Sequence, residues 1–190
     1  MRTFFVALVP ALWLIWLAFW IVAAIGTKQT VRRENRGSRL GHGIPMLVGA
    51  LLLGVPHILG GALEQRFHAH TFGWFLFGAV LTALGLGFAM AARLWLGGNW
   101  SANVTLKQGH ELIRSGPYAF VRHPIYTGLL LALAGTVIVV GRWRAVIALV
   151  VLLAGLIFKI GVEERFMAEQ FGEAYARYRS QVAALIPFVV

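Results

Sequence analysis

A stretch of about 35 almost wholly apolar residues, which begins after Tyr126 and ends at Glu163, constrains the fold of this chain more than any other feature. The segment Gly141–Arg144 breaks it once, into runs of roughly 16 and 17 residues. At about 1.5 Å of rise per helical residue, each run reaches about 25 Å, near the lower limit for crossing a bilayer. Two such helices joined by a tight turn form a hairpin. The segments Arg122–Tyr126 and Glu163–Glu164 are therefore expected to meet at one end of it.

The composition places the whole chain in a membrane. Its 190 residues are 59% hydrophobic, with a mean hydropathy of +0.76, which is typical of an integral membrane protein and excludes an ordinary soluble domain. We expect an all-α membrane protein with about five transmembrane helices and a C-terminal amphipathic helix, in a single domain over residues 1–190. The predicted spans are residues 3–26, 44–63, 72–92, 125–140 and 145–161.

The charge distribution predicts the orientation. The net charge of +10 comes from 17 Lys and Arg residues against 7 acidic ones. In a membrane protein, an excess of basic residues marks the cytoplasmic side. With the N-terminus outside, 13 basic residues fall on the inner side and 4 on the outer side, so we expect a cytoplasmic C-terminus in a bacterial inner membrane or its equivalent. Topology and contact with membrane lipids explain the basic charge, and no nucleic-acid partner is expected.

No metal site is expected. The chain contains no cysteine, which excludes thiolate ligands. His68 and His70 lie on the predicted outer side, and His110 and His123 have no obvious third and fourth ligands.

Two stripes of residues at helical spacing predict how the helices pack. Ala83, Gly87 and Ala91 recur every four residues, and small side chains in this pattern allow another membrane helix to approach closely. After Glu164, a second stripe predicts an amphipathic helix on the inner surface or against the bundle. We interpret this stripe as packing rather than as a cofactor site; it consists of Phe171, Tyr175, Tyr178 and Val182.

The polar residues at the ends of the predicted hairpin are candidates for a site. Pro124 favours an extended backbone at His123, which orients the imidazole, and Arg122 offers a planar fork for a carboxylate or phosphate. Glu163 and Glu164 place two like charges at the interface, which is costly unless cations or ligand donors lie close. The alternative is that the basic residues are interfacial anchors balanced by the glutamates. We favour a site because several candidates share one short segment: His110, Tyr118, His123 and Tyr126.

From Gly109 to Gly128 the chain reads GHELIRSGPYAFVRHPIYTG, and the Glu163–Glu164 pair is followed by Phe171–Tyr175 and by Ile186–Pro187. The order and spacing of these motifs resemble the isoprenylcysteine carboxyl methyltransferase family. The related membrane phospholipid methyltransferases share much of the pattern. The resemblance covers about residues 93–188, half of the chain.

By this resemblance, the chain is expected to transfer a methyl group from S-adenosylmethionine to a lipidic or prenylated acceptor held partly in the membrane. Residues 93–190 would form the cofactor-binding catalytic half, behind three N-terminal spans in residues 1–92. The positions that match the family's cofactor pocket are His110, Glu111, Leu112, Ile113, Tyr118, His123, Pro124, Ile125, Tyr126, Glu163 and Glu164. Lys159 stands where eukaryotic members have an arginine, and substrate positioning is expected from Arg93, Asn99, Arg122 and Lys159.

The chemistry of the acceptor stays open between two classes. A carboxylate, which the resemblance favours, is ionised at neutral pH and attacks the methyl group without a base. A phospholipid amine must first lose a proton, so His123 or a glutamate would act as base. Two further alternatives are an NADPH-dependent sterol or enone reductase, which pairs a similar motif with acidic residues, and a non-catalytic lipid-binding protein.

Overall fold

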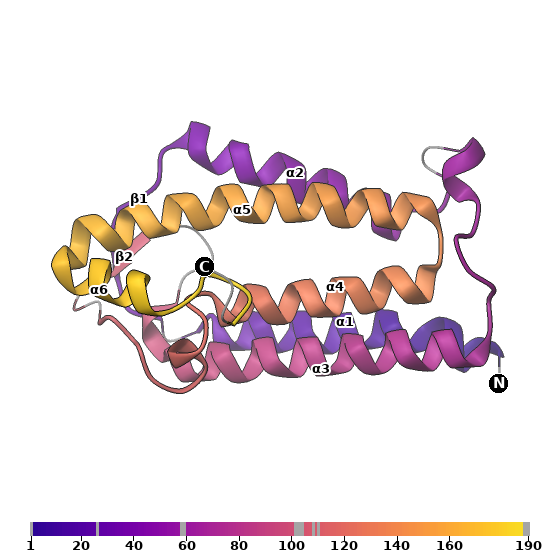
Figure 1. Cartoon of the computed structure of the whole chain (residues 1–190), viewed down its shortest axis with the longest axis horizontal. Helices are drawn as coiled ribbons and strands as arrows, with labels where there is room; N and C mark the ends of the chain where they lie inside the picture. Colours follow the sequence, from indigo (N-terminus) through magenta and orange to yellow (C-terminus); the bar gives the residue numbers. More distant parts are fainter. Residues whose placement is uncertain are drawn as a thin grey trace.

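Within the described residues, five long helices run along the longest axis of the molecule (Figure 1). The structure is a computed structural model, and it describes residues 2–25, 27–57, 60–100, 105–107, 109 and 111–187. In chain order the elements are α1 (Arg2–Ala23), β1 (Thr30–Arg33), α2 (Arg36–Gly54), η1 (Gly61–Glu64), α3 (Phe72–Leu96), η2 (Gly97–Asn99), β2 (Thr105–Lys107), η3 (Gly116–Ala119), α4 (Pro124–Val140), α5 (Trp143–Phe171) and α6 (Glu173–Gln181).

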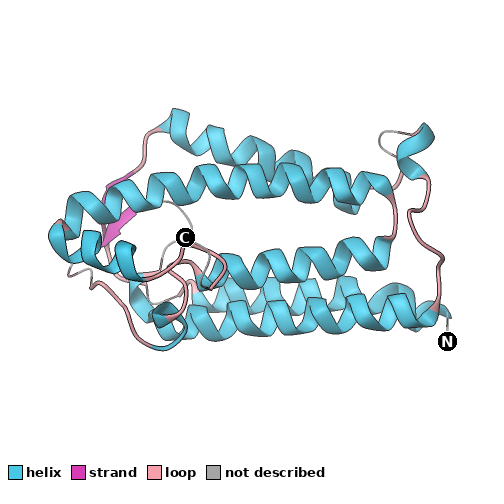
Figure 2. Ribbon diagram, in the orientation of Figure 1, coloured by secondary structure: helices cyan, strands magenta, loops and turns pink. Residues whose placement is uncertain are grey.

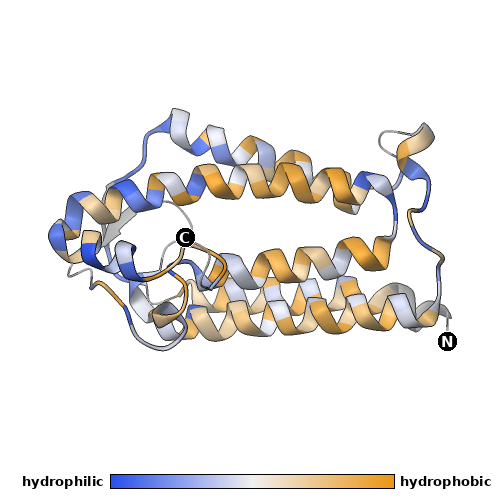
Figure 3. Cartoon of the chain, in the orientation of Figure 1, coloured by the Kyte–Doolittle hydropathy of each residue, from blue (hydrophilic) through white to orange (hydrophobic). Residues whose placement is uncertain are grey.

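The helices form two packed groups. α3 packs along α4 and against α1, whereas α2 packs along α5. Although a short turn joins α4 to α5, these two helices contact each other far less than each contacts its own group. Figure 1 shows one layer of α2 and α5 and another of α1, α3 and α4. Hydrophilic residues gather at the end of the bundle that carries α6 and the strands (Figure 3).

Glycines set the distance between α3 and α4. A Cβ added at Gly85 would lie 2.5 Å from the Gly128 carbonyl oxygen, and one added at Gly78 would lie 2.6 Å from the Gly135 carbonyl oxygen. Backbone atoms do not yield to such a contact, so glycine is required for this close crossing. Thr82, fully buried beside them, donates to the Gly78 carbonyl at 2.8 Å.

The predicted small-residue stripe lies on the wrong face of α3. Ala83, Gly87 and Ala91 are exposed, and a Cβ added at Gly87 would meet no described atom within 4 Å. Because α3 carries small residues on both sides, the spacing alone does not indicate which side the partner helix takes.

The second predicted span is also wrong in its bounds. α2 begins at Arg36 because Asn35 caps it: the Asn35 Oδ1 accepts a hydrogen bond from the Ser38 N–H at 2.7 Å. The helix ends at Gly54, since the proline that follows Val55 keeps that residue extended. The predicted span 44–63 therefore starts too late and runs too far.

The last predicted span continues beyond its expected end. α5 passes through both glutamates to Phe171 and stops at Gly172, whose φ of +49° is a conformation that favours glycine. α6 follows and buries Tyr175 and Tyr178. The predicted amphipathic segment is thus divided between the end of α5 and α6.

Two helices in the described part of the chain are long and apolar enough to cross a membrane, over Phe72–Asn99 and Trp143–Phe171. The apolar helices Ala7–Ala23 and Pro124–Val140 are shorter. The helical architecture is confirmed, whereas the number of about five crossings stays a prediction.

A small sheet, absent from the sequence prediction, joins distant parts of the chain. β1, which follows α1, pairs antiparallel with β2 (Figure 2), and Thr30 lies opposite Lys107. The Lys28 N–H donates to the Gly98 carbonyl at 3.0 Å. The connection between α1 and α2 is therefore attached to the segment between α3 and α4.

Replacing Gly85 by alanine is expected to destabilise the folded protein by about 1–3 kcal/mol, because the added methyl group forces the α3 and α4 backbones apart. Gly87→Ala is the matched control, since its methyl group points into open space and alanine has the higher helix propensity. Its stability should stay equal or rise. Thermal unfolding in one detergent compares the variants, and equal melting temperatures would contradict this account of the crossing.

Candidate active site

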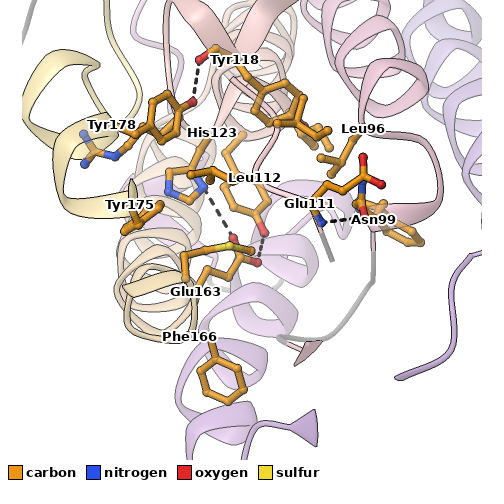
Figure 4. Close-up of a pocket in the computed structure, with 16 residues that line it drawn as sticks. Leu96, Asn99, Glu111, Leu112, Tyr118, His123, Glu163, Phe166, Tyr175 and Tyr178 are labelled. Carbon is orange, nitrogen blue, oxygen red and sulfur yellow. Dashed lines mark hydrogen bonds and ion pairs between the residues drawn. The ribbon is translucent and has the colours of Figure 1, made fainter. Parts of the chain in front are cut away.

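The start of α4 and the later part of α5 bring His123, Tyr126 and Glu163 together. Figure 4 shows the His123 ring beside the Glu163 carboxylate. The Tyr126 hydroxyl donates to Glu163 Oε1 at 2.5 Å, and His123 Nδ1 lies 3.6 Å from Glu163 Oε2. Lys159, one turn earlier on α5, places its Nζ 3.9 Å from the same carboxylate. The rings of His123 and Tyr126 stack with centroids 5.7 Å apart. The hairpin closes as predicted, and it gathers donors around one carboxylate.

The neighbouring Glu164 has a different environment. Arg122 donates to Glu164 Oε1 from Nε at 2.8 Å and places Nη2 at 2.7 Å, and the arginine side chain is 9% exposed. Arg179 of α6 adds a contact, with its Nε 3.5 Å from Oε2. His123 Nε2 lies 3.4 Å from Oε1. Glu164 therefore joins the start of α4, α5 and α6 in one ion-pair cluster.

Arg122 also attaches the C-terminal segment to α4. Its Nη1 donates to the carbonyls of Arg179 and Val182, and its main-chain N–H donates to the Ala183 carbonyl at 2.8 Å. With Glu164 and two carbonyls as acceptors, the guanidinium is well satisfied although it is buried.

Pro124 and His123 set the entry into α4. Pro124 is the first helical residue and is fully buried. His123 adopts φ −125° and ψ 60°, which is non-helical as predicted, although less extended than a residue before proline usually is. This backbone places the two imidazole nitrogens toward the two glutamates.

These residues form one wall of a cavity with an empty volume of about 890 Å³, part of which opens to solvent. The other walls come from the end of α3, the segment between α3 and α4, and α6. The lining is mainly apolar and aromatic, with carboxylates at Glu111 and Glu163. Cavities lined mainly by apolar and aromatic side chains with a few polar groups bind small molecules.

Most residues predicted to bind a cofactor lie around this cavity. Those that line it are Glu111, Leu112, Ile113, Tyr118, His123, Ile125, Tyr126 and Glu163. Pro124 and Glu164, both described, lie outside the lining and support it. His110 lies outside the described residues. Their roles as ligands stay predictions.

Arg93, predicted to position a substrate, is hydrogen-bonded to main-chain carbonyls. It is 4% exposed and donates to the carbonyls of Ala23 and Gly97. Its guanidinium lies over the Trp100 ring at 4.5 Å. Arg93 therefore links the ends of α1 and α3 and lies outside the described cavity lining.

The other three residues predicted to position a substrate lie closer to the cavity. Asn99 and Arg122 line it. Lys159 lies beside the lining, with its Nζ 5.5 Å from the centre of the Tyr126 ring.

Sequence reasoning missed some lining residues. Phe166 and Met167 line the cavity and follow Glu163 by three and four positions, the spacing of one helix face, so that signal was available. Leu96 and Trp100 also line it and carried no such signal.

The aromatic stripe of α6 has a double role. Tyr175 and Tyr178 are buried, as the packing interpretation predicted, and both also line the cavity. The Tyr178 hydroxyl donates to the Tyr118 carbonyl at 2.6 Å. Burial raises the pKa of Tyr178 to about 12, so the hydroxyl remains a protonated donor at neutral pH.

Comparisons with known proteins show which family the chain resembles. The profile of the phospholipid methyltransferase family matches residues 74–174. The protein-S-isoprenylcysteine O-methyltransferase A of Arabidopsis thaliana is 31% identical over 151 residues, which cover 78% of this chain and 74% of that protein. The protein-S-isoprenylcysteine O-methyltransferase of Schizosaccharomyces pombe is 31% identical over 109 residues, 56% of this chain and 46% of that protein. The match thus spans about half the length of the fission yeast relative.

A solved structure has a similar fold. It is that of the eukaryotic intramembrane Ras methyltransferase, an isoprenylcysteine carboxyl methyltransferase, with a TM-score of 0.53 and 24% identity. The match covers 80% of this chain and 52% of that one. The resemblance seen in the motifs is confirmed by the family profile and by the Arabidopsis relative. The chain therefore belongs to the membrane methyltransferase family that contains the isoprenylcysteine and phospholipid methyltransferases.

Proposed function

We propose that this chain is an S-adenosylmethionine-dependent methyltransferase that acts at a membrane and methylates the carboxyl group of an isoprenylcysteine-like lipidic acceptor. The names of the Arabidopsis and fission yeast relatives support this reaction. The single observation that carries the proposal is the Glu163 carboxylate, which Tyr126 and His123 hold at the wall of the cavity.

The residues around the cavity fit an adenosyl amino acid. Glu111 and Glu163 offer carboxylates to ribose hydroxyls or to an ammonium group, and Leu112, Ile113 and Phe166 offer apolar surface to an adenine ring. When bound, S-adenosylmethionine supplies a methyl group activated on a sulfonium sulfur.

The proposed role of the protein is mainly to position the methyl donor and the acceptor and to exclude water from them. Tyr126 and His123 keep Glu163 in one place, so its oxygens accept hydrogen bonds from a ligand without reorganising. A carboxylate acceptor is ionised at neutral pH and needs no base. Orientation of two reactants is worth up to about 7–11 kcal/mol in well-arranged systems, enough to supply much of the acceleration.

Lys159 is the proposed contact for the acceptor carboxylate. Its side chain is 12% exposed and lies on α5 between Glu163 and the apolar part of the helix. An ammonium group attracts a carboxylate as a point charge, without the two-pronged fork of arginine. A position next to the apolar part of α5 suits an acceptor whose lipid tail stays in the membrane.

We also propose that the N-terminus lies outside and that the cavity opens toward the cytoplasm. The excess of basic residues near the cavity end, in the α1–α2 connection and in α6, supports this orientation. A protein substrate carrying a prenyl group would then meet the site from the cytoplasmic side.

A phospholipid amine is the second candidate acceptor, and the description of the matching family favours it. An ammonium group attacks only after losing its proton, and His123, in contact with both glutamates, would be the base. The two acceptors give different products, since alkali hydrolyses a methyl ester and leaves a methylamine intact.

Calorimetric titration of S-adenosylhomocysteine into detergent-purified protein is the first test, and we expect micromolar binding. Glu163→Gln should raise the Kd about 10- to 100-fold, because a hydrogen bond to a charged group contributes about 1.5–3 kcal/mol. His123→Ala should weaken binding in the same direction. NADPH titrated alone should not bind; binding of NADPH without the adenosyl ligand would identify a reductase, and binding of neither would overturn the proposal.

Unfolding measurements should separate the two glutamates. Glu164→Gln is expected to lower the stability of the ligand-free protein by about 3 kcal/mol, because Arg122 is left buried without its carboxylate. Glu163→Gln should lower it much less. Adding Arg122→Met to Glu164→Gln should recover part of the loss. Equal losses in the two single variants would contradict the division of roles between these neighbours.

Transfer of a labelled methyl group to a prenylcysteine analogue tests the acceptor. We expect a product from which alkali releases labelled methanol. Lys159→Met should raise the KM for the analogue about tenfold while the Kd of S-adenosylhomocysteine changes much less, because Lys159 lies 3.9 Å from Glu163 and beside the cavity lining. Lys159→Arg should retain activity because it keeps the charge. Alkali-stable label on a phospholipid would instead establish the amine acceptor.

A further inference from the structure

Lys28 follows α1, outside the segment 74–174 that the family profile matches, and its side chain contacts residues of the cavity wall. The Nζ donates to Asn99 Oδ1 at 2.9 Å and to the Gly109 carbonyl at 2.8 Å, and it lies 3.5 Å from Glu111 Oε1. The three hydrogens of one ammonium group thus face three oxygens.

The partners of Lys28 belong to the cavity. Asn99 and Glu111 line it, and Asn99 Oδ1 also accepts from the Glu111 N–H at 3.4 Å. The main-chain N–H of Lys28 donates to the Gly98 carbonyl at 3.0 Å. One residue therefore connects Asn99, in η2 directly after α3, with Gly109 and Glu111, which follow about ten residues later in the chain.

This attachment matters because Gly109 and Glu111 are both exposed. Gly109 adopts φ +59°, and a Cβ added there would meet no described atom within 4 Å. The Glu111 side chain is 70% exposed, so its ion pair with Lys28 contributes little by itself. The two shorter hydrogen bonds, to the buried Asn99 and to Gly109, carry most of the attachment.

We infer that Lys28 is a positioning residue of the donor-binding cavity: it holds Asn99, Gly109 and Glu111 in the arrangement that receives the methyl donor. The inference rests on the proposed function. By this inference, a residue of the N-terminal half supports a cavity whose sequence motifs lie in the C-terminal half. Lys28 acts through Asn99 and Glu111, without contact with the reacting atoms.

The cysteine-free sequence permits a chemical test. Lys28→Cys introduces one thiol, whose thiolate displaces bromide from 2-bromoethylamine and forms a thioether of lysine's length that ends in an ammonium group. Iodoacetamide alkylates the same thiol with loss of iodide and leaves a neutral amide of similar length. Arg39→Cys, at an exposed position of α2, receives both treatments as the control.

We expect Lys28→Cys to raise the Kd of S-adenosylhomocysteine about tenfold. Aminoethylation should return the Kd to within about threefold of wild type, and the neutral amide should leave it raised. The melting temperature without ligand and the KM for the acceptor at saturating donor should change little, whereas a purely structural role would lower the melting temperature first. The Kd of the Arg39→Cys control should stay at the wild-type value throughout.

The outcomes separate this inference from the proposed function. An unchanged Kd in Lys28→Cys, with wild-type binding intact, would overturn the inference and leave the function standing. Restoration by the neutral amide as fully as by the ammonium group would also overturn it. Absence of binding in the wild-type protein would overturn the proposed function and the role of Lys28 together.

Discussion

The buried contact between Arg122 and Glu164 decides which way α5 presents its two glutamates. Consecutive residues of an α-helix point about 100° apart, so once Arg122 holds Glu164, the Glu163 side chain faces Tyr126 and the cavity. The same cluster includes Arg179 of α6. One ion pair thereby assembles α4, α5 and α6 around the site, and its cost of burial is offset by the carbonyl acceptors that complete the shell of Arg122.

The site lies where two groups of helices meet at one end. Glycine contacts unite α3 with α4, and α2 packs closely on α5, whereas α4 and α5 contact each other less. Polar contacts occur at both ends of the bundle: Tyr126 binds Glu163 at the site, and Arg142 binds Glu64 at the far end. In the middle of the bundle, the Trp13 indole donates to the Thr136 hydroxyl at 3.0 Å, within the group of α1, α3 and α4, so polar groups there have protein partners, as suits a medium without hydrogen-bonding solvent. Under the proposed function, such an arrangement gives the lipidic acceptor an apolar approach to a polar end.

The parts of the site that were predictable share a local signal. Tyr126 lies three residues after His123, and both glutamates follow an apolar run of helical length, so their meeting follows from hairpin geometry. The bounds of α2 were missed because its first turns are basic and resemble a loop; the capping by Asn35 outweighs that composition. The α3 interface was missed because Gly85 and Gly87 are equally small, and the choice between their faces depends on where Gly128 lies.

The sequence by itself determined the membrane character, the helical architecture, the hairpin and the family, because these depend on hydropathy, spacing and short motifs that can be read within one segment. The tertiary structure alone decided that Glu163 faces the cavity while Glu164 supports it. It also decided that Arg93 binds main-chain carbonyls and that Lys28 binds Asn99. These choices depend on contacts between residues far apart in the chain. No local pattern specifies such a contact, since the partner of a charged side chain is set by how the helices pack.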